Sequence, residues 1–406
     1  CAGPSPDERV VDNERNTVVL NMRGQAAIVG IGETPWYKRG TSPHSEFSNA
    51  IRAIVAASDD AGIDPADIDG FVSWGSERNS GTYMMGSLGT KELRFGSLVW
   101  THGGGSAGSI GLAATGVATG QTDYCVVIRS MAETDSNSRL NVAVNQGGPP
   151  AMARANGMVS PAQLIAIEAE RSFHDGLSRD ALWAFVEASY HHANRNPNAY
   201  GREMRLDRED YDNARMPVEP LKLFDNSREN DKAIALIITS AERAKDLRQP
   251  PAYILSSMHG RYGDRDHSFS ESPDGRRTSG YRAVAKRMWE QSGYQPADVD
   301  VTQVYSNTSI FGLVGMIDHG LVTWENVNEQ LTFENLIAPS GRLPINTAGG
   351  DLADGFLHGA GNNIEGVRQI RGTSPNQVPD AQLSLIFGGP GDAFTSTTLL
   401  GTEATL

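Results

Sequence analysis

Three glycine-rich segments hold the residues best suited to chemistry. A glycine turn at the start of a helix leaves backbone N–H groups that can stabilise a developing oxyanion. For any one segment, close packing of a helix on a strand is an equally good explanation. Three such segments at strand ends favour a binding site. They are residues 102–106, 346–351 and 387–391, and their substrate-binding candidates are Gly105, Ser106, Gly349, Gly350 and Gly388.

Two other patterns do not carry the chemistry that they first suggest. Gly30 and Gly32 begin a dinucleotide-type glycine motif, but Pro35 stands where its third glycine would be, so the phosphate cradle fails. His191 and His192 are adjacent and would point to different faces of a helix, so they are not a metal pair. The sequence therefore predicts no metal site and no bound cofactor in this chain.

Composition narrows the class of protein. The chain has 406 residues and a net charge of −14, which argues against nucleic-acid binding through a broad basic face. Apolar runs such as 234–238 are too short to cross a bilayer, so we expect no membrane protein. Only Cys1 and Cys125 are present, which excludes a disulfide scaffold and a cysteine zinc site and fits a reduced, cytoplasmic setting.

An internal repeat identifies the elements that must position the glycine segments. Residues 61–69 and 292–300 share a pattern in which Gly62, Pro65, Ala66, Asp67 and Asp69 recur as Gly293, Pro296, Ala297, Asp298 and Asp300. A helical segment precedes each copy, at 50–58 and 283–291. A strand-like segment follows each copy, at 70–74 and 301–305. The glycine of each copy stands where a helix would end.

A second correspondence follows in the same order. His102 and three glycines open a small-residue helix to Gly120, followed by a strand at 124–128. His358 and Gly359 open a helix to Gly372, followed by a strand at 383–387. Two matches in one order predict a duplicated α/β fold.

The repeat also suggests domain limits. We expect a flexible N-terminal extension at 1–23, a first half at 24–249 and a second half at 250–406. An insert of about 130–230 lies inside the first half. Within it, Ser160-Pro161 and Ser178 are helix-start signals, for helices that end near Phe173 and Arg195.

The chain resembles the thiolase superfamily, in its sterol-carrier-type branch of lipid-transfer-protein-like members. The resemblance covers about residues 25–400 and rests on segments 25–32, 218–223, 343–347, 355–359 and 365–372. It implies two βαβαβαββ halves in a five-layered αβαβα fold with an inserted helical loop domain, usually as a homodimer.

Departures from the thiolase pattern decide the expected chemistry. The nucleophilic cysteine position falls at about Gly105, the second cysteine position near Ile386, and the usual active-site histidine on Phe356. Tyr305 stands where the third motif opens. The chain therefore cannot carry an acyl group on cysteine. Ser106 is a weak substitute because no base lies beside it in sequence.

The same losses occur in the steroid side-chain aldolases of this branch, which resemble the chain in the Gly-Gly-Gly stretch and at Tyr305. The resemblance implies retro-aldol cleavage of a β-hydroxyacyl-CoA, in complex with a small OB-fold, zinc-ribbon partner. Tyr305 would take the hydroxyl proton, amides near Gly105 and Gly388 would hold the thioester oxygen, and His358 would orient a water or return a proton. Those aldolases have a second tyrosine where this chain has Phe356.

The expected assembly is a homodimer within a heterotetramer, with any zinc in the partner. Two alternatives stay open. One is a cysteine-independent acyl-CoA condensing or decarboxylating enzyme that uses the same oxyanion donors. The other is a non-catalytic thiolase-like subunit that binds acyl-CoA or serves as a scaffold for a partner.

Overall fold

The computed structural model describes residues 22–75, 77–99, 101–132, 155–158, 160–261, 270–271, 277–278, 280–389 and 394–406. The predicted extension 1–23 lies outside these residues except for its last two positions. The first part of the predicted insert and the end of the third glycine segment are outside them as well.

The first half of the chain builds one mixed sheet. Its strand order is β1 (Ala26–Glu33), β6 (Asn230–Ser240), β5 (Cys125–Met131), β3 (Gly70–Trp74) and β4 (Phe95–Val99). The first two pairings are antiparallel and the last two are parallel. The short β2 (Tyr37–Lys38) adds to β6.

The second half repeats this order. It runs β7 (Ala252–Gly260), β12 (Thr395–Gly401), β11 (Leu383–Gly388) and β10 (Val301–Val304). Two antiparallel pairings are again followed by a parallel one. Where the first half has β4, a parallel bridge joins Thr302 to Ile345. The matching topology confirms the duplicated fold.

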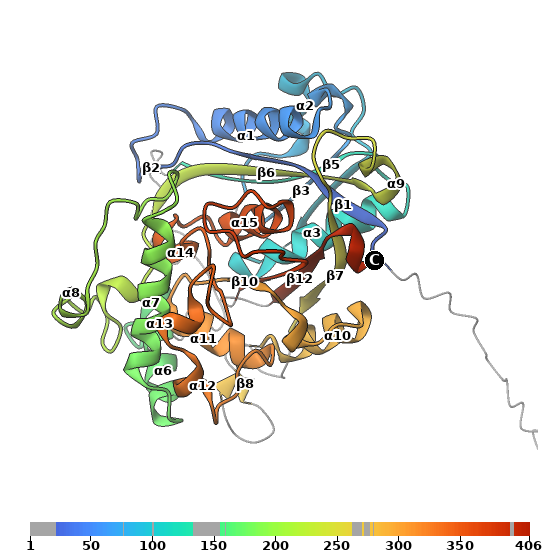
Figure 1. Ribbon diagram of the computed structural model, residues 1–406. Coiled ribbons are helices and arrows are strands. Elements are labelled where there is room, and N and C mark those ends of the chain that lie inside the picture. Colours follow the sequence, from blue (N-terminus) through green and yellow to red (C-terminus); the bar gives the residue numbers. More distant parts are fainter. Residues whose placement is uncertain are drawn as a thin grey trace, which may run out of the picture.

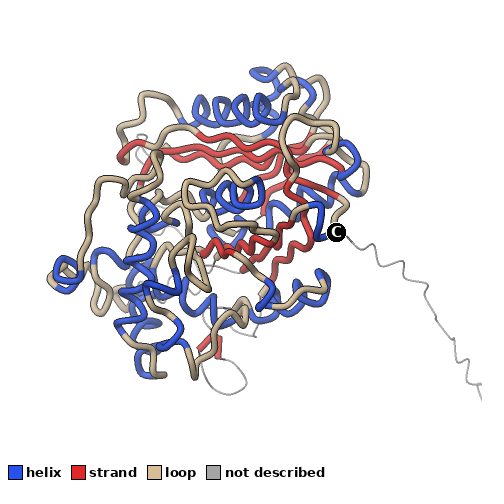
Figure 2. Tube along the Cα trace, viewed as in Figure 1, coloured by secondary structure: helices blue, strands red, loops and turns tan. Residues whose placement is uncertain are grey.

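The two halves are joined edge to edge, because β1 pairs antiparallel with β7, and helices form three layers around the two sheet halves (Figures 1 and 2). Helix α1 (Glu46–Ala61) covers the outer face of the first sheet, and α10 (Arg282–Ser292) covers the outer face of the second. Between the sheets lie α3 (Ser106–Ala118) and α15 (Ala360–Arg371), and α3 contacts strands of both. The predicted αβαβα layering is confirmed.

The remaining elements extend this frame. Two helices of the predicted insert begin at the expected signals, and they end at His174 and Ala193, close to the expected positions. The other elements are α2 (Gly81–Leu88), η2 (Gly103–Gly105), α6 (Pro161–His174), α7 (Arg179–Ala193), α8 (Arg208–Asp212), η3 (Leu223–Asp225), α9 (Ala241–Ala244), β8 (Ser270–Glu271), β9 (Arg277–Thr278), α11 (Ser309–Asp318), α12 (Val327–Gln330), α13 (Phe333–Leu336), α14 (Gly350–Ala353) and η5 (Glu403–Thr405).

The repeated glycine has the same structural role in both halves. Gly62 ends α1 with φ 79°, and Gly293 ends α10 with φ 77°, the left-handed region in which a side chain is strained. Each turn leads into a 3₁₀ helix that begins at the repeated proline, η1 (Pro65–Asp67) and η4 (Pro296–Asp298).

The repeated aspartate ties neighbouring strands together. Asp69 precedes β3 and accepts the N–H groups of Asp123 and Tyr124 at 3.0 Å, just before β5. Asp300 precedes β10 and accepts the N–H groups of Gln382 and Leu383 at 2.8 and 2.9 Å, at the start of β11. One carboxylate therefore sets the parallel pairing in each half.

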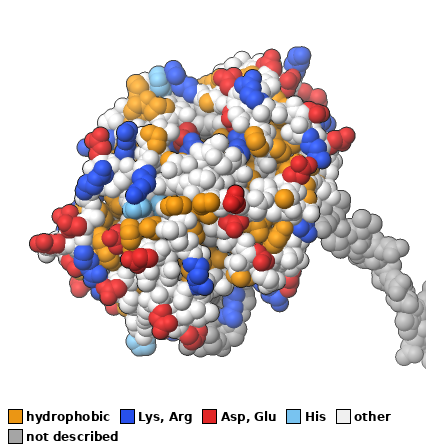
Figure 3. All heavy atoms as spheres, in the orientation of Figure 1, with side chains coloured by type: hydrophobic (Ala, Val, Ile, Leu, Met, Phe, Trp, Pro, Cys, Tyr) orange, Lys and Arg blue, Asp and Glu red, His pale blue; other side chains and the backbone are white. Residues whose placement is uncertain are grey.

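The molecular surface mixes both signs of charge (Figure 3). Acidic and basic side chains are interspersed over the face shown, and apolar side chains lie between them. Within the described residues, no helix is both long and apolar enough to cross a membrane.

Replacing either repeated aspartate should destabilise the fold. Asp69→Ala should cost about 1–3 kcal/mol or more of unfolding free energy, because it strands two backbone donors and also removes the hydrogen bond to Thr122 Oγ1 and the ion pair with Arg94. Asp300→Ala should cost less, because only the two amides lose their acceptor. Urea unfolding would measure both. Asp180→Ala, at a side chain 80% exposed, is the control and should change little.

Candidate active site

Tyr305 lies at the meeting point of the two halves. It follows β10, is 2% exposed, and its N–H donates to the Phe387 carbonyl at 3.2 Å. A Cβ added at Gly103 would overlap the Tyr305 ring and hydroxyl, and one at Gly359 would lie 2.9 Å from Tyr305 Cδ2. The phenol therefore sits between the turn before α3 and the loop before α15, the convergence that the sequence predicted for Tyr305 and the His358 loop.

Ser106 lies beside it, as the first residue of α3. A Cβ at Gly359 would stand 2.7 Å from Ser106 Oγ, and one at Gly388 would overlap that atom. Ser106 is 1% exposed, and within the described part of the chain its hydroxyl has no hydrogen-bond partner. The first and third glycine segments thus meet around a buried hydroxyl.

The turn before α3 presents different amides from those predicted. The Gly105 N–H donates to the His102 carbonyl at 3.0 Å, and the Ser106 N–H donates to the Gly103 carbonyl. Gly105 also packs on Trp74, 2.7 Å from where its Cβ would be. The Gly103 and Gly104 amides come before the first residue whose N–H is bonded within the turn. They are the better candidates to hold an oxyanion, and only the 3₁₀ geometry reveals them.

The second glycine segment contributes to the site indirectly. Gly349 and Gly350 have φ 113° and 59° and lead into α14. A Cβ at Gly349 would meet Ala193, and one at Gly350 would meet Asn346. These two glycines shape the turn that delivers Asp351.

Asp351 joins the loops on either side of the site. Its carboxylate accepts the Ser306 N–H at 2.9 Å and the Gly359 N–H at 3.1 Å, directly after Tyr305 and His358. It is 3% exposed, and burial raises its pKa to about 7, although both amide hydrogen bonds act in the opposite direction. Sequence reasoning missed Asp351, since no local pattern shows that its partners lie on two other loops.

His358 is held on three sides. Its backbone has φ 52°, and its carbonyl accepts the Trp74 indole N–H at 3.3 Å. Its Nδ1 lies 2.9 Å from an Arg129 terminal nitrogen, and its ring meets Phe356 edge-on at 5.0 Å. The histidine predicted to serve the reaction is therefore fixed next to the position at which related aldolases are expected to carry a second tyrosine.

The chemistry of thiolase cysteines has no counterpart at these positions. Gly105 and Ile386 occupy the two expected cysteine positions, and Ile386 is fully buried. Cys125 is buried in β5, and burial raises the pKa of its thiol far above the ordinary range. Among the described residues, no group of three or more histidine, cysteine and acidic side chains could hold a metal ion.

The fold is a thiolase-type duplication, and its site has a buried tyrosine and glycine amides where thiolases have cysteines. These features define a class of thiolase-like proteins without a cysteine nucleophile, and comparison with known proteins agrees. Residues 263–403 match the family described as "Thiolase C-terminal domain-like". The chain is 34% identical over 391 residues to "17-hydroxy-3-oxo-4-pregnene-20-carboxyl-CoA lyase" of Mycobacterium tuberculosis, covering 94% of this chain and 100% of that protein. It is 32% identical over 403 residues to the "Steroid side-chain-cleaving aldolase" of Thermomonospora curvata, covering 94% and 99%.

Solved structures point the same way. The "Ltp2-ChsH2(DUF35) aldolase" superposes with a TM-score of 0.87 at 32% identity, over 95% of this chain and 100% of that chain. Human mitochondrial 3-ketoacyl-CoA thiolase shares the fold, with a TM-score of 0.64 at 12% identity over 94% of this chain and all of that one. The chain belongs to the thiolase superfamily, in its steroid side-chain-cleaving aldolase group.

The buried Asp351 carboxyl makes a testable contribution to the pH dependence of stability. Its native pKa of about 7 lies above the ordinary value of about 3.9. Between these values the native state binds a proton that the unfolded state does not, so this group stabilises the protein increasingly as the pH falls from about 7 to about 4. Asp351→Asn removes that dependence.

Urea unfolding at several pH values would measure it. The free energy of unfolding of the parent minus that of Asp351→Asn should rise as the pH falls through this window. Asp354, whose pKa burial raises to about 6, titrates in both proteins, so its own contribution is largely removed by taking the difference. Asp180→Asn, at an exposed side chain, is the control. A difference that stays constant from pH 7 to 4 would show that Asp351 is ionised throughout.

Proposed function

We propose that this chain cleaves a β-hydroxyacyl-CoA of a steroid or similar side chain by a retro-aldol reaction, with Tyr305 as the base. The observation that carries this proposal is the burial of the Tyr305 hydroxyl against the Gly103 turn, at the N-terminus of α3. The positive end of a helix favours a phenolate there. The named activities of the relatives in Mycobacterium and Thermomonospora support the substrate class.

The steps balance without a covalent intermediate. Tyr305 takes the proton of the β-hydroxyl, the Cα–Cβ bond breaks, and a ketone or aldehyde leaves. The electron pair remains on the acyl-CoA fragment as an enolate. In this proposal the Gly103 and Gly104 amides and the Ser106 hydroxyl donate to the enolate oxygen, and the Gly388 backbone packs against Ser106. A proton then returns to Cα, and His358 orients a water or assists that return.

Phe356 leaves the site with one hydroxyl group fewer than the two tyrosines expected in related aldolases. Its ring is buried and cannot transfer a proton, and its N–H donates to Asn230 Oδ1. Proton transfer from the β-hydroxyl therefore rests on Tyr305 alone. The same observation favours a second candidate function, a thiolase-like subunit that binds acyl-CoA without cleaving it. A cysteine-independent condensing reaction would need the same oxyanion donors and stays as a further alternative.

The proposed assembly is a homodimer that recruits a small OB-fold, zinc-ribbon partner. The aldolase that superposes with a TM-score of 0.87 is named for two components, Ltp2 and ChsH2(DUF35), which supports the recruitment. Strand β4 supports the dimer, because it ends the sheet order and its residues 96–98 are exposed, with Leu98 45% exposed. An exposed sheet edge is a template for pairing with another strand. A cytoplasmic location belongs to the same proposal, since acyl-CoA is the substrate class.

Removing the Tyr305 hydroxyl should slow cleavage strongly without unfolding the chain. Tyr305→Phe removes one oxygen and little volume, and the cleavage rate of β-hydroxyacyl-CoA should fall by about 100-fold or more. Phe356→Tyr restores the second hydroxyl and should raise the rate or leave it unchanged. A Tyr305→Phe protein that cleaves at the parental rate would remove Tyr305 from the mechanism. Cleavage by Phe356→Tyr alone would identify the natural chain as the binding subunit.

The dimer proposal predicts that a charged residue on the exposed edge strand β4 lowers the mass of the assembly. Leu98→Glu should shift the light-scattering mass at micromolar concentration from two copies of the chain towards one, because a buried carboxylate in the paired edge is costly. Val55→Glu, at an equally apolar and 37% exposed position on α1, is the matched control and should leave the mass unchanged. A parent that already runs as a stable monomer would contradict the proposal.

A further inference from the structure

The side chain of Arg129 reaches from the first half of the chain to the histidine of the second. Arg129 lies on β5, is 2% exposed, and its terminal nitrogen is 2.9 Å from His358 Nδ1. An arginine that is buried at this depth needs partners for its charge and its N–H groups. Nothing in the proposed reaction so far requires it.

Glu77 supplies the balancing charge. Its carboxylate lies 3.2 Å from the other terminal nitrogen of Arg129, and both side chains are 2% exposed. The same carboxylate oxygen accepts the Ser130 N–H at 2.8 Å. Glu77 therefore holds the β5 backbone and the guanidinium together, and the guanidinium has a fixed orientation toward the histidine.

Donor and acceptor chemistry then fixes the state of His358. A guanidinium has only N–H donors and stays charged, so Nδ1 must accept with its lone pair. The proton of the neutral imidazole is therefore on Nε2. Protonation of Nδ1 would break this hydrogen bond and would set two positive charges side by side. The His102 ring, 5.7 Å from that of His358, and the Phe356 ring are its other described ring neighbours.

We propose that Glu77 and Arg129 are positioning residues that hold His358 as a neutral Nε2–H donor. The inference rests on the proposed function and narrows the part of His358 in it. A neutral imidazole donates a hydrogen bond to developing negative charge on the enolate oxygen, and it is a poor source of a transferred proton. The proton that Tyr305 takes from the β-hydroxyl is then the one returned to Cα, and Tyr305 is restored as a phenolate. Tyr305 therefore both accepts and returns the proton, and no second acid or base is needed.

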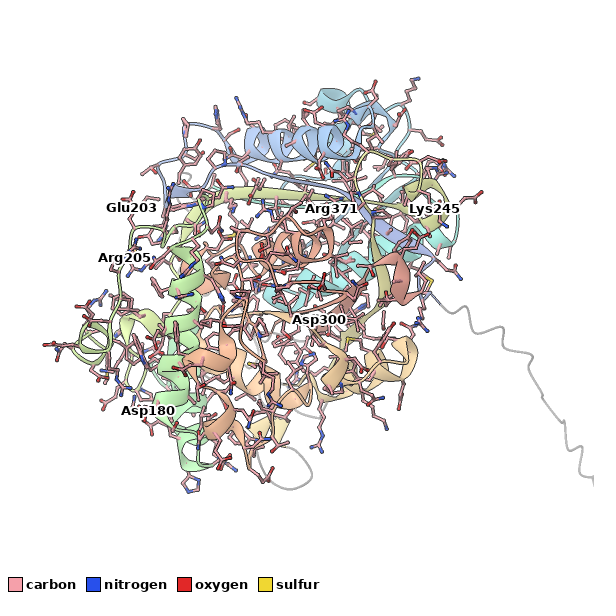
Figure 4. The ribbon with its side chains drawn as sticks, in the orientation of Figure 1. Asp180, Glu203, Arg205, Lys245, Asp300 and Arg371 are labelled. Atoms are coloured by element: carbon pink, nitrogen blue, oxygen red, sulfur yellow. The ribbon has the colours of Figure 1, made fainter. Side chains whose placement is uncertain are left out.

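The first test reads the ring directly and needs no activity. In protein labelled with ¹⁵N-histidine, with His358→Gln used to assign the resonance, His358 should carry its proton on Nε2 and none on Nδ1 near neutral pH. Arg129→Met should weaken this preference. Glu77→Gln combined with Arg129→Met removes both charges and serves if the single variant does not fold. Arg371→Met breaks another ion pair, between the far end of α15 and Asp60 of α1 (Arg371 in Figure 4), and should leave the His358 signal unchanged.

The second test separates the two ring nitrogens by rate. A glutamine amide can place its N–H₂ near the Nε2 position of histidine, and an asparagine amide near the Nδ1 position. His358→Gln should keep kcat within about tenfold of the parent, whereas His358→Asn should lower kcat by about 100-fold, the usual worth of one oxyanion donor. KM should change little in either variant.

The outcomes keep the two proposals apart. An Nδ1–H tautomer in the parent protein, or equal rates for His358→Gln and His358→Asn, would overturn the positioning role even if Tyr305→Phe abolishes cleavage. A parent that carries the Nε2–H tautomer but cleaves no β-hydroxyacyl-CoA would overturn the proposed function, while the Arg129-held state of the ring would stand.

Discussion

The candidate site depends on one steric constraint, the close approach of three glycine backbones to two buried side chains. Gly103 and Gly359 flank the Tyr305 phenol, and Gly359 and Gly388 flank Ser106 Oγ. A methyl group at any of the three would collide with a side chain that the proposed reaction uses. Helices α3 and α15 are held between two sheets, so neither can move away to make room (Figure 1). The packing of the central layer therefore restricts the position of both side chains.

Duplication explains both the stability of this arrangement and its asymmetry. The aspartates and glycines that shape the scaffold recur in each half, and both aspartates accept two backbone N–H groups just before or at the start of the next strand, as Asp300 (labelled in Figure 4) does at the start of β11. The histidines that open the two glycine segments, His102 and His358, also correspond in the repeat, and their rings lie 5.7 Å apart. Arg129 distinguishes them, because its guanidinium bonds to the ring of His358. The contact that the proposed reaction uses is therefore one that the repeat does not share.

Sequence reasoning succeeded for features that depend on neighbours in the chain. The strand at 70–74 has the predicted limits, and both repeated glycines end helices, because periodicity and turn chemistry are local. The meeting of the Tyr305 and His358 loops followed from their places in a duplicated fold. Asp351 and Arg129 could not be predicted. Arg129 and His358 are 229 positions apart, and nothing around Arg129 distinguishes it from an arginine at the end of a buried strand.

The exchange of a tyrosine for Phe356 is consistent with catalysis if the remaining groups act separately. A positioned acid or base contributes about 10²–10⁴-fold in rate, and one oxyanion donor contributes about 10²–10³-fold. The loss of one hydroxyl therefore removes one factor and leaves the others, provided that each has its own support. The three groups have different main supports, although Gly359 contacts both Tyr305 and Ser106: Tyr305 packs on the Gly103 turn, Ser106 begins α3, and Arg129 and Glu77 hold His358. Asp351 also links two of them, through the amides that follow Tyr305 and His358. Because it binds backbone and not the reacting side chains, it preserves their spacing whether position 356 carries a hydroxyl or not.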